Sequence, residues 1–143
     1  MGNQQRTIER TIIPTGPATL DTLRPYLDRW HELWKVEQRD VEIGRGLTAS
    51  LKPFLLDLIR QRLADKTLLR HRDHLEMLGG EIICRRHGDP DLAKQALSRL
   101  LLTFVEAEGG PLIWPRITES AQRSFDATCR KRYRFLQQQN IRK

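Results

Sequence analysis

The first periodic stretch of the chain lies between residues 19 and 34. Its apolar positions recur at steps of three and four residues, which is the spacing of one helix face: Leu20, Leu23, Leu27, Trp30, Leu33 and Trp34. Thr19 or Asp21 has a side chain suited to cap the first turn, although Pro25 also allows a start near Leu23. The pattern predicts one amphipathic helix that ends after Trp34.

A second helix is expected after Gly44 and Gly46, which interrupt the apolar pattern. Pro53 stands near its expected start, and its apolar stripe comprises Leu51, Phe54, Leu55, Leu58, Ile59 and Leu63. Residues 64–66 predict a tight turn.

Thr67 is expected to cap a third helix that runs towards His87 and Gly88, with an apolar stripe at Leu68, Leu75, Leu78, Ile82 and Ile83. Paired glycines are unfavourable inside a helix. The Gly79–Gly80 pair therefore predicts a kink or an end in this helix.

Two more helices are predicted in the C-terminal part. Asp89 followed by Pro90 is typical of a helix start, and the apolar stripe after it reaches Val105 before a glycine pair at residues 109–110. Thr118 is expected to cap the last helix. No alternating strand pattern is present, so the predicted fold class is all-α: a single-domain bundle of about five helices over residues 18–143, preceded by an extended or flexible arm over residues 1–17.

The composition of the 143 residues narrows the class of protein. The N-terminus lacks the apolar core of a signal peptide, and no apolar run approaches the ~20 residues of a membrane-spanning helix, so we expect a cytoplasmic protein. Cys84 and Cys129 are too few for a disulfide framework. The formal net charge of +7 and the pI near 10.0 favour a polyanionic partner.

The positive charge is concentrated in two segments. Bases exceed acids by three between residues 60 and 87 and by five from residue 117 to the end, whereas they cancel over residues 1–59. The run at residues 130–134 comprises Arg130, Lys131, Arg132, Tyr133 and Arg134, which favours phosphate contacts with stacking or hydrogen bonding by the tyrosine. The alternative is a solvated face whose cations complement the helix dipole, with Tyr133 packed between helices.

The segment over residues 54–79 has the pattern of a helix, a short turn and a second helix opened by a threonine, with its characteristic positions at Leu63, Thr67, Leu68, Arg70, Leu75 and Leu78. In these positions it resembles the core-binding domain of phage-integrase-type tyrosine recombinases. In that family this SAM-like helical domain grips DNA. The resemblance implies that the residues approaching phosphates are Lys66, Thr67, Arg70, Arg72 and His74.

The same segment also has the pattern of a helix-turn-helix, in which the helix opened by Thr67 would enter the major groove. Arg70 would then contact guanine instead of gripping the backbone. The segments around residues 78–83, 108–112 and 125–131 resemble small proteins of bacterial mobile elements, a likeness that fits a stand-alone DNA-binding accessory.

Catalytic chemistry is not expected from this chain. The recombinase catalytic domain is absent, none of the four histidines begins a His-x-x-Arg motif, and Tyr133 is therefore not expected to be a nucleophile. No glycine-rich phosphate loop is present, and His71, His74, Cys84 and His87 are spread too far along one helix to share a metal. We expect neither a metal nor any other cofactor.

Two functional classes are therefore compatible with the sequence. The first is a non-catalytic DNA-binding accessory related to site-specific recombination or mobile elements, which binds duplex DNA and has a recombinase or other protein subunit as a further partner. The second is a helical interaction or assembly subunit of a larger complex, with a passive basic surface. Trp30 and Trp34 are expected to be core or interface anchors, and Trp114 an exposed contact.

Overall fold

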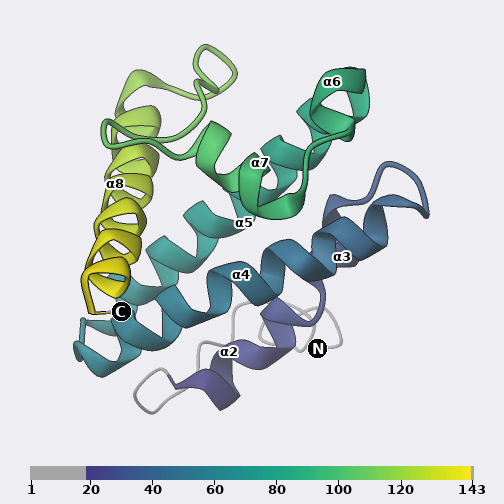
Figure 1. Ribbon diagram of the computed structural model, residues 1–143. Coiled ribbons are helices and arrows are strands. Elements are labelled where there is room, and N and C mark those ends of the chain that lie inside the picture. Colours follow the sequence, from purple (N-terminus) through teal and green to yellow (C-terminus); the bar gives the residue numbers. More distant parts are fainter. Residues whose placement is uncertain (1–18, 143) are drawn as a thin grey trace, which may run out of the picture.

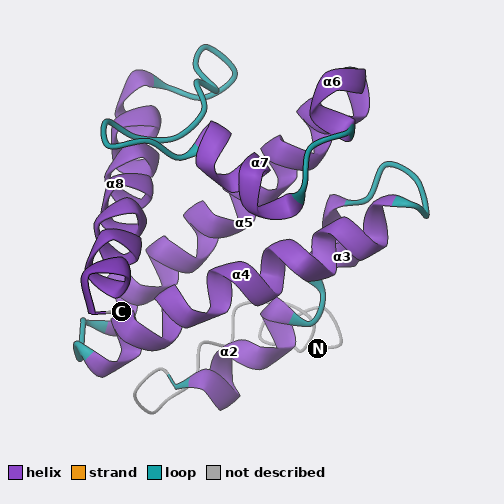
Figure 2. Ribbon diagram, in the orientation of Figure 1, coloured by secondary structure: helices purple, strands orange, loops and turns teal. Residues whose placement is uncertain are grey.

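The computed structural model describes residues 19–142, in which helices are joined by loops and no β-strand forms (Figure 1, Figure 2). The predicted all-α class is confirmed for this part of the chain. The predicted arm over residues 1–17 lies outside the described residues.

Two long antiparallel helices, α4 (Asp40–Arg60) and α5 (Asp65–Gly88), form the centre of the bundle (Figure 1). α2 (Leu20–Leu27) packs on α4, and α3 (Trp30–Trp34) packs on both α4 and α5. α7 (Leu97–Phe104) contacts α4, the short α6 (Pro90–Ala93) contacts α5, and α8 (Glu119–Arg142) crosses α5. Apolar side chains of α2, α3, α4, α5, α7 and α8 share one continuous core.

α4 runs without interruption through Gly44, Gly46 and Pro53, so the predicted break and the predicted start near Pro53 are both wrong. The glycines serve close packing instead of a turn. A Cβ on Gly44 would lie 3.0 Å from the Cα of His31, and one on Gly46 would lie 2.6 Å from Cδ2 of Leu97. Contact with α3 and α7 thus offsets the low helix propensity of glycine, which is about 1 kcal/mol per residue.

α5 is also unbroken, and the predicted kink or end at the Gly79–Gly80 pair is wrong. The indole of Trp34 lies directly over Gly79, where a Cβ would be 2.2 Å from Cζ2 of that ring. The helix begins at Asp65, and the N-cap position is held by Ala64, which makes no side-chain cap bond. The prediction that Thr67 caps this helix is therefore wrong as well, because Thr67 lies inside the first turn.

The single helix predicted over residues 19–34 is two helices, separated by a turn at residues 28–29. Thr19 caps α2, and its Oγ1 accepts a hydrogen bond from the Thr22 N–H at 3.3 Å. The Trp30 and Trp34 rings stack with their centroids 5.2 Å apart, and their N–H groups donate to the side chain and the main-chain oxygen of Glu76. These two buried rings are core anchors that fix α3 on α5.

The single helix predicted after Asp89 is likewise two, because α6 ends at Ala93 and α7 begins at Leu97. The predicted start is confirmed: Asp89 Oδ1 accepts from the Asp91 N–H at 2.9 Å, with Pro90 as the first helical residue. The predicted cap of the last helix is also confirmed, since Thr118 Oγ1 accepts from the Ala121 N–H at 3.0 Å.

The turn between α4 and α5 contains one residue in a strained backbone conformation. Arg62 has a φ of 57°, in the left-handed region that non-glycine residues rarely adopt. Glycine adopts this conformation without steric cost, so Arg62→Gly is expected to raise the free energy of unfolding by up to about 1 kcal/mol. Urea denaturation measures the change, with Arg60→Gly at the end of α4 as the control that should be destabilising. A lower unfolding midpoint for Arg62→Gly would contradict the expectation.

Candidate nucleic-acid interface

The two basic segments predicted from the sequence lie against each other. The first half of α5 packs on α8 (Figure 1). The two helices are joined where His71 and His74, one turn apart on α5, both contact Thr128 of α8. Each histidine Nδ1 lies 2.7 Å from Thr128 Oγ1. This contact sets which side chains of the two helices face outward.

The shared hydroxyl limits the roles of the two neutral imidazoles. A threonine hydroxyl has one O–H donor and two acceptor lone pairs, so at most one of the two Nδ1 atoms accepts from it and at least one carries the N–H that donates to it. Burial lowers the pKa of His71 to about 4, and the nearby cations Lys131 and Arg70 act in the same direction. The pKa of His74 is lowered too, mainly by burial. Both rings are thus held neutral at pH 7.

Acidification is expected to weaken the fold through His71. In the folded chain its pKa is lowered from 6.5 to about 4, so below pH 6.5 the unfolded chain takes up a proton that the folded chain does not. The stabilisation is complete above pH 6.5 and is lost as the pH falls towards 4, by up to about 3 kcal/mol. Urea titrations at several pH values should show this loss, and His71→Gln should reduce it. An unchanged pH dependence in His71→Gln would contradict the assignment.

Two of the arginines that were predicted to contact phosphates make contacts within the protein instead. Arg72, whose side chain is only 15% exposed, pairs with Asp73 at 2.6 Å and lies 4.0 Å over the ring of Tyr26. Arg130 Nη1 donates to the main-chain oxygen of Glu108 at 3.1 Å. These two arginines hold α2 and the loop before α8 in place.

Four other predicted residues also face the protein interior, wholly or in part. Arg132 is buried, with 3% of its surface exposed, and Tyr133 is half-buried against the core. His74 bonds Thr128 and meets the ring of Phe125 edge-on, and Thr67 is half-buried in the first turn of α5. Arg132 in particular does not face outward with the exposed cations of α8.

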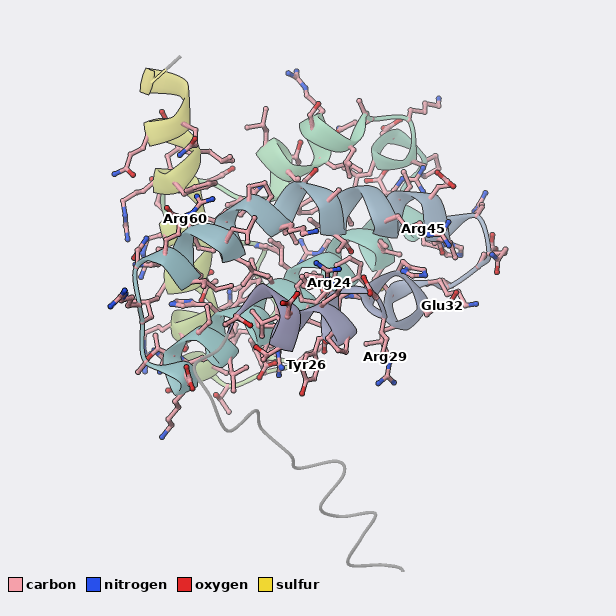
Figure 3. The ribbon with its side chains drawn as sticks, turned by 90° about the horizontal axis from the view of Figure 1, so that it is seen from below. Arg24, Tyr26, Arg29, Glu32, Arg45 and Arg60 are labelled. Atoms are coloured by element: carbon pink, nitrogen blue, oxygen red, sulfur yellow. The ribbon has the colours of Figure 1, made fainter. Side chains whose placement is uncertain are left out.

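The remaining predicted residues do form an accessible surface, to which the end of α4 adds one residue. Lys66 and Arg70 are exposed on α5, one turn apart, and Arg134 is exposed on α8 one turn after the half-buried Lys131. Arg60 was missed by sequence reasoning, and Figure 3 shows it at the end of α4 that lies beside α8. We call this set the basic surface: Arg60, Lys66, Arg70, Lys131 and Arg134.

The charge of the basic surface is largely uncompensated. Among the described residues, no ion pair joins any of its five members to a carboxylate. Lys131 and Arg134 line a small polar pocket of about 110 Å³ together with Asp57, whose carboxylate accepts a hydrogen bond from Gln61 at 2.7 Å. Arg70 and Lys131 both lie close enough to His71 for their positive charges to lower its pKa.

A second group of cations lies at the other end of α5 and is compensated by acids. Arg86 and His87 line a pocket of about 440 Å³ with Arg39 and Lys94. The buried Asp40 lies 4.0 Å from Arg86 Nη1 and 3.8 Å from His87 Nδ1, and it accepts main-chain hydrogen bonds that lower its pKa. This group therefore stabilises the junction of α3, α4 and α5.

The face built from α2, α3 and the start of α4 has charges of both signs (Figure 3). Arg24 pairs with Asp21 at 3.8 Å, and Lys35 pairs with Glu32 at 2.7 Å. Arg45 adds its attraction to the same Glu32 carboxylate, whose pKa is lowered chiefly by the Lys35 hydrogen bond. This mixed face lacks the single sign of charge that a phosphate-binding surface needs.

Within residues 19–142, none of the helices combines the length and apolar character needed to traverse a lipid bilayer. No protein-family model, curated protein or solved structure matches this chain.

Proposed function

We propose that this chain is a non-catalytic nucleic-acid-binding protein that grips duplex DNA with its basic surface. The observation that carries the proposal is the position of five cationic residues on adjoining parts of three helices, without an ion-paired acid among the described residues (Figure 1). Exposed charges of one sign attract phosphates when they act together within a Debye length, ~8 Å at physiological salt.

The basic surface suits the DNA backbone better than the edges of the bases. It combines the end of α4, the first turns of α5 and one side of α8, so its cations are spread over three helices. Backbone gripping needs such a distributed charge, whereas base reading needs one helix end to project into a groove. Arg70, in the second turn of α5, is the residue best placed for a base contact if α5 does enter the major groove.

The biological role that we propose is a DNA-binding accessory related to site-specific recombination or mobile elements. It rests on the resemblance of residues 54–79 to the recombinase core-binding domain. Arg70 matches that pattern, the resemblance implies that Lys66 approaches phosphates, and both residues belong to the basic surface. A recombinase or another DNA-bound subunit is the corresponding protein partner.

A fluorescence-anisotropy titration tests DNA binding directly. The purified chain is titrated with random duplex DNA, single-stranded DNA and RNA at several salt concentrations. We expect duplex binding. The logarithm of its binding constant should fall linearly with the logarithm of the salt concentration, with a slope of about −4.5 for the five cations. No duplex binding at low salt would overturn the proposal. Tighter binding to RNA than to duplex DNA would mean that RNA is the partner.

An assembly role is the second candidate, favoured by the exposed apolar residues around the loop before α8. Leu112 is 62% and Trp114 is 45% exposed, and both line a shallow hollow beside Gln122 of α8. Exposed aromatic and aliphatic residues in one place are typical of protein contacts. Size-exclusion chromatography with light scattering distinguishes this role, because a monomer with its own DNA affinity would argue against it.

A further inference from the structure

Arg132 of α8 is a buried cation without an anionic partner among the described residues. Only 3% of the residue is exposed, and its Nη2 donates one long hydrogen bond of 3.3 Å to the main-chain oxygen of Ser50. Its Nε and Nη1 are buried and have no hydrogen-bond partner. Burial lowers the pKa of Arg132 to about 10, so the guanidinium still carries its charge at pH 7.

The side chain forms part of the wall of a pocket between α4, α7 and α8. The pocket has a volume of about 380 Å³, which lies in the range of small-molecule sites. Its lining is mainly apolar, and no acidic residue contributes to it: Ser50, Ser98, Leu101, Leu102, Val105, Arg132, Tyr133, Leu136 and Gln137. A single cation in an otherwise neutral and largely apolar pocket is therefore its distinguishing feature.

An unpaired buried charge is costly, because the protein interior solvates it less well than water does. The cost falls when an anion enters the low-dielectric surroundings of the cation, and guanidinium binds carboxylates with matched geometry. We infer that this pocket binds a small amphipathic carboxylate, whose carboxylate group pairs with Arg132 while its hydrocarbon part packs on Leu101, Leu102 and Leu136.

The pocket is distinct from the basic surface and from the other cation group. Lys131 and Arg134 face the end of α4, whereas Arg132 and Leu136 face α7 on another side of α8. The cations at the far end of α5 have Asp40 beside them, but Arg132 has only a neutral carbonyl group. A carboxylate with an apolar chain suits the Arg132 pocket better than a DNA phosphate, because the phosphate has no hydrocarbon part that could pack on the leucines of the pocket.

Titration calorimetry with octanoate, and with 1-octanol as the uncharged counterpart, tests the inference. We expect octanoate to bind at least about 10-fold more tightly than octanol, because only the carboxylate pairs with the guanidinium. Arg132→Met is expected to fold, since it replaces an unpaired buried charge with an apolar chain of similar length, and to remove the preference for octanoate.

Two further variants separate a binding role from a structural one. Leu102→Asp places a carboxylate at an exposed position of the pocket lining, leaves Arg132 intact and should weaken octanoate binding. Arg123→Met removes an exposed cation elsewhere on α8 and should leave octanoate binding unchanged. Equal affinities for octanoate and octanol, no binding of octanoate, or unchanged octanoate binding in Arg132→Met would each overturn the inference. The result is independent of whether the chain binds DNA.

Discussion

Gly79→Ala is expected to lower the free energy of unfolding by about 2 kcal/mol or more. The new Cβ would lie 2.2–2.5 Å from three atoms of the Trp34 indole. The ring cannot retreat cheaply, because its N–H donates to the Glu76 oxygen at 2.8 Å and its face stacks on Trp30. Overpacking of this kind costs about 1–3 kcal/mol and more in rigid surroundings, which outweighs the gain of about 1 kcal/mol in helix propensity.

The same helix supplies the matched control. Gly88 is the last residue of α5, and a Cβ added to it would meet no atom within 4 Å, so Gly88→Ala should be neutral or slightly stabilising. Urea denaturation of the two variants compares one chemical change at a packed and at an open position. A Gly79→Ala protein as stable as Gly88→Ala would mean that Trp34 does not rest on Gly79. Trp34→Phe in the Gly79→Ala background should recover part of the lost stability, since a smaller ring leaves room for the methyl group.

The helix boundaries divide into those that local chemistry determines and those that packing determines. The caps at Thr19, Asp89 and Thr118 depend on a side chain and a main-chain N–H two or three residues away, and they form as the sequence predicts. The glycines at positions 44, 46 and 79 were expected to end or kink helices, yet each lies inside one. Their role depends on partners such as Trp34 and Leu97, which are distant in sequence.

The basic site was predictable as segments but not as individual residues, and helix geometry explains why. Successive residues of an α-helix point about 100° apart, so a run of five consecutive residues points in every direction around the axis. Within residues 130–134, Arg134 is exposed, Arg130 bonds a loop carbonyl oxygen and Arg132 is buried. Arg60 was not among the predicted site residues. The second helix was expected to extend to Leu63, so Arg60 lay inside it, and the sequence does not indicate that this part of the helix lies beside α8.

Neutralising four members of the basic surface is expected to reduce duplex DNA affinity at least about 100-fold at low salt. The variant carries Arg60→Gln, Arg70→Gln, Lys131→Gln and Arg134→Gln. Each lost phosphate contact removes about one released counterion, so the slope of log affinity against log salt should also become shallower by about 3 to 4. Anisotropy titrations at several salt concentrations measure both quantities.

A second variant with the same change in net charge makes this result specific to the surface. Arg24, Arg29, Arg45 and Arg123 are exposed and lie outside the basic surface, three of them on the face shown in Figure 3. Replacing these four by glutamine should lower affinity only slightly, because Arg24 and Arg45 already act on nearby carboxylates. If both variants lost the same affinity, net charge alone would account for DNA binding and the basic surface would have no special role. If only the first variant lost affinity, the convergence of α4, α5 and α8 would be its cause.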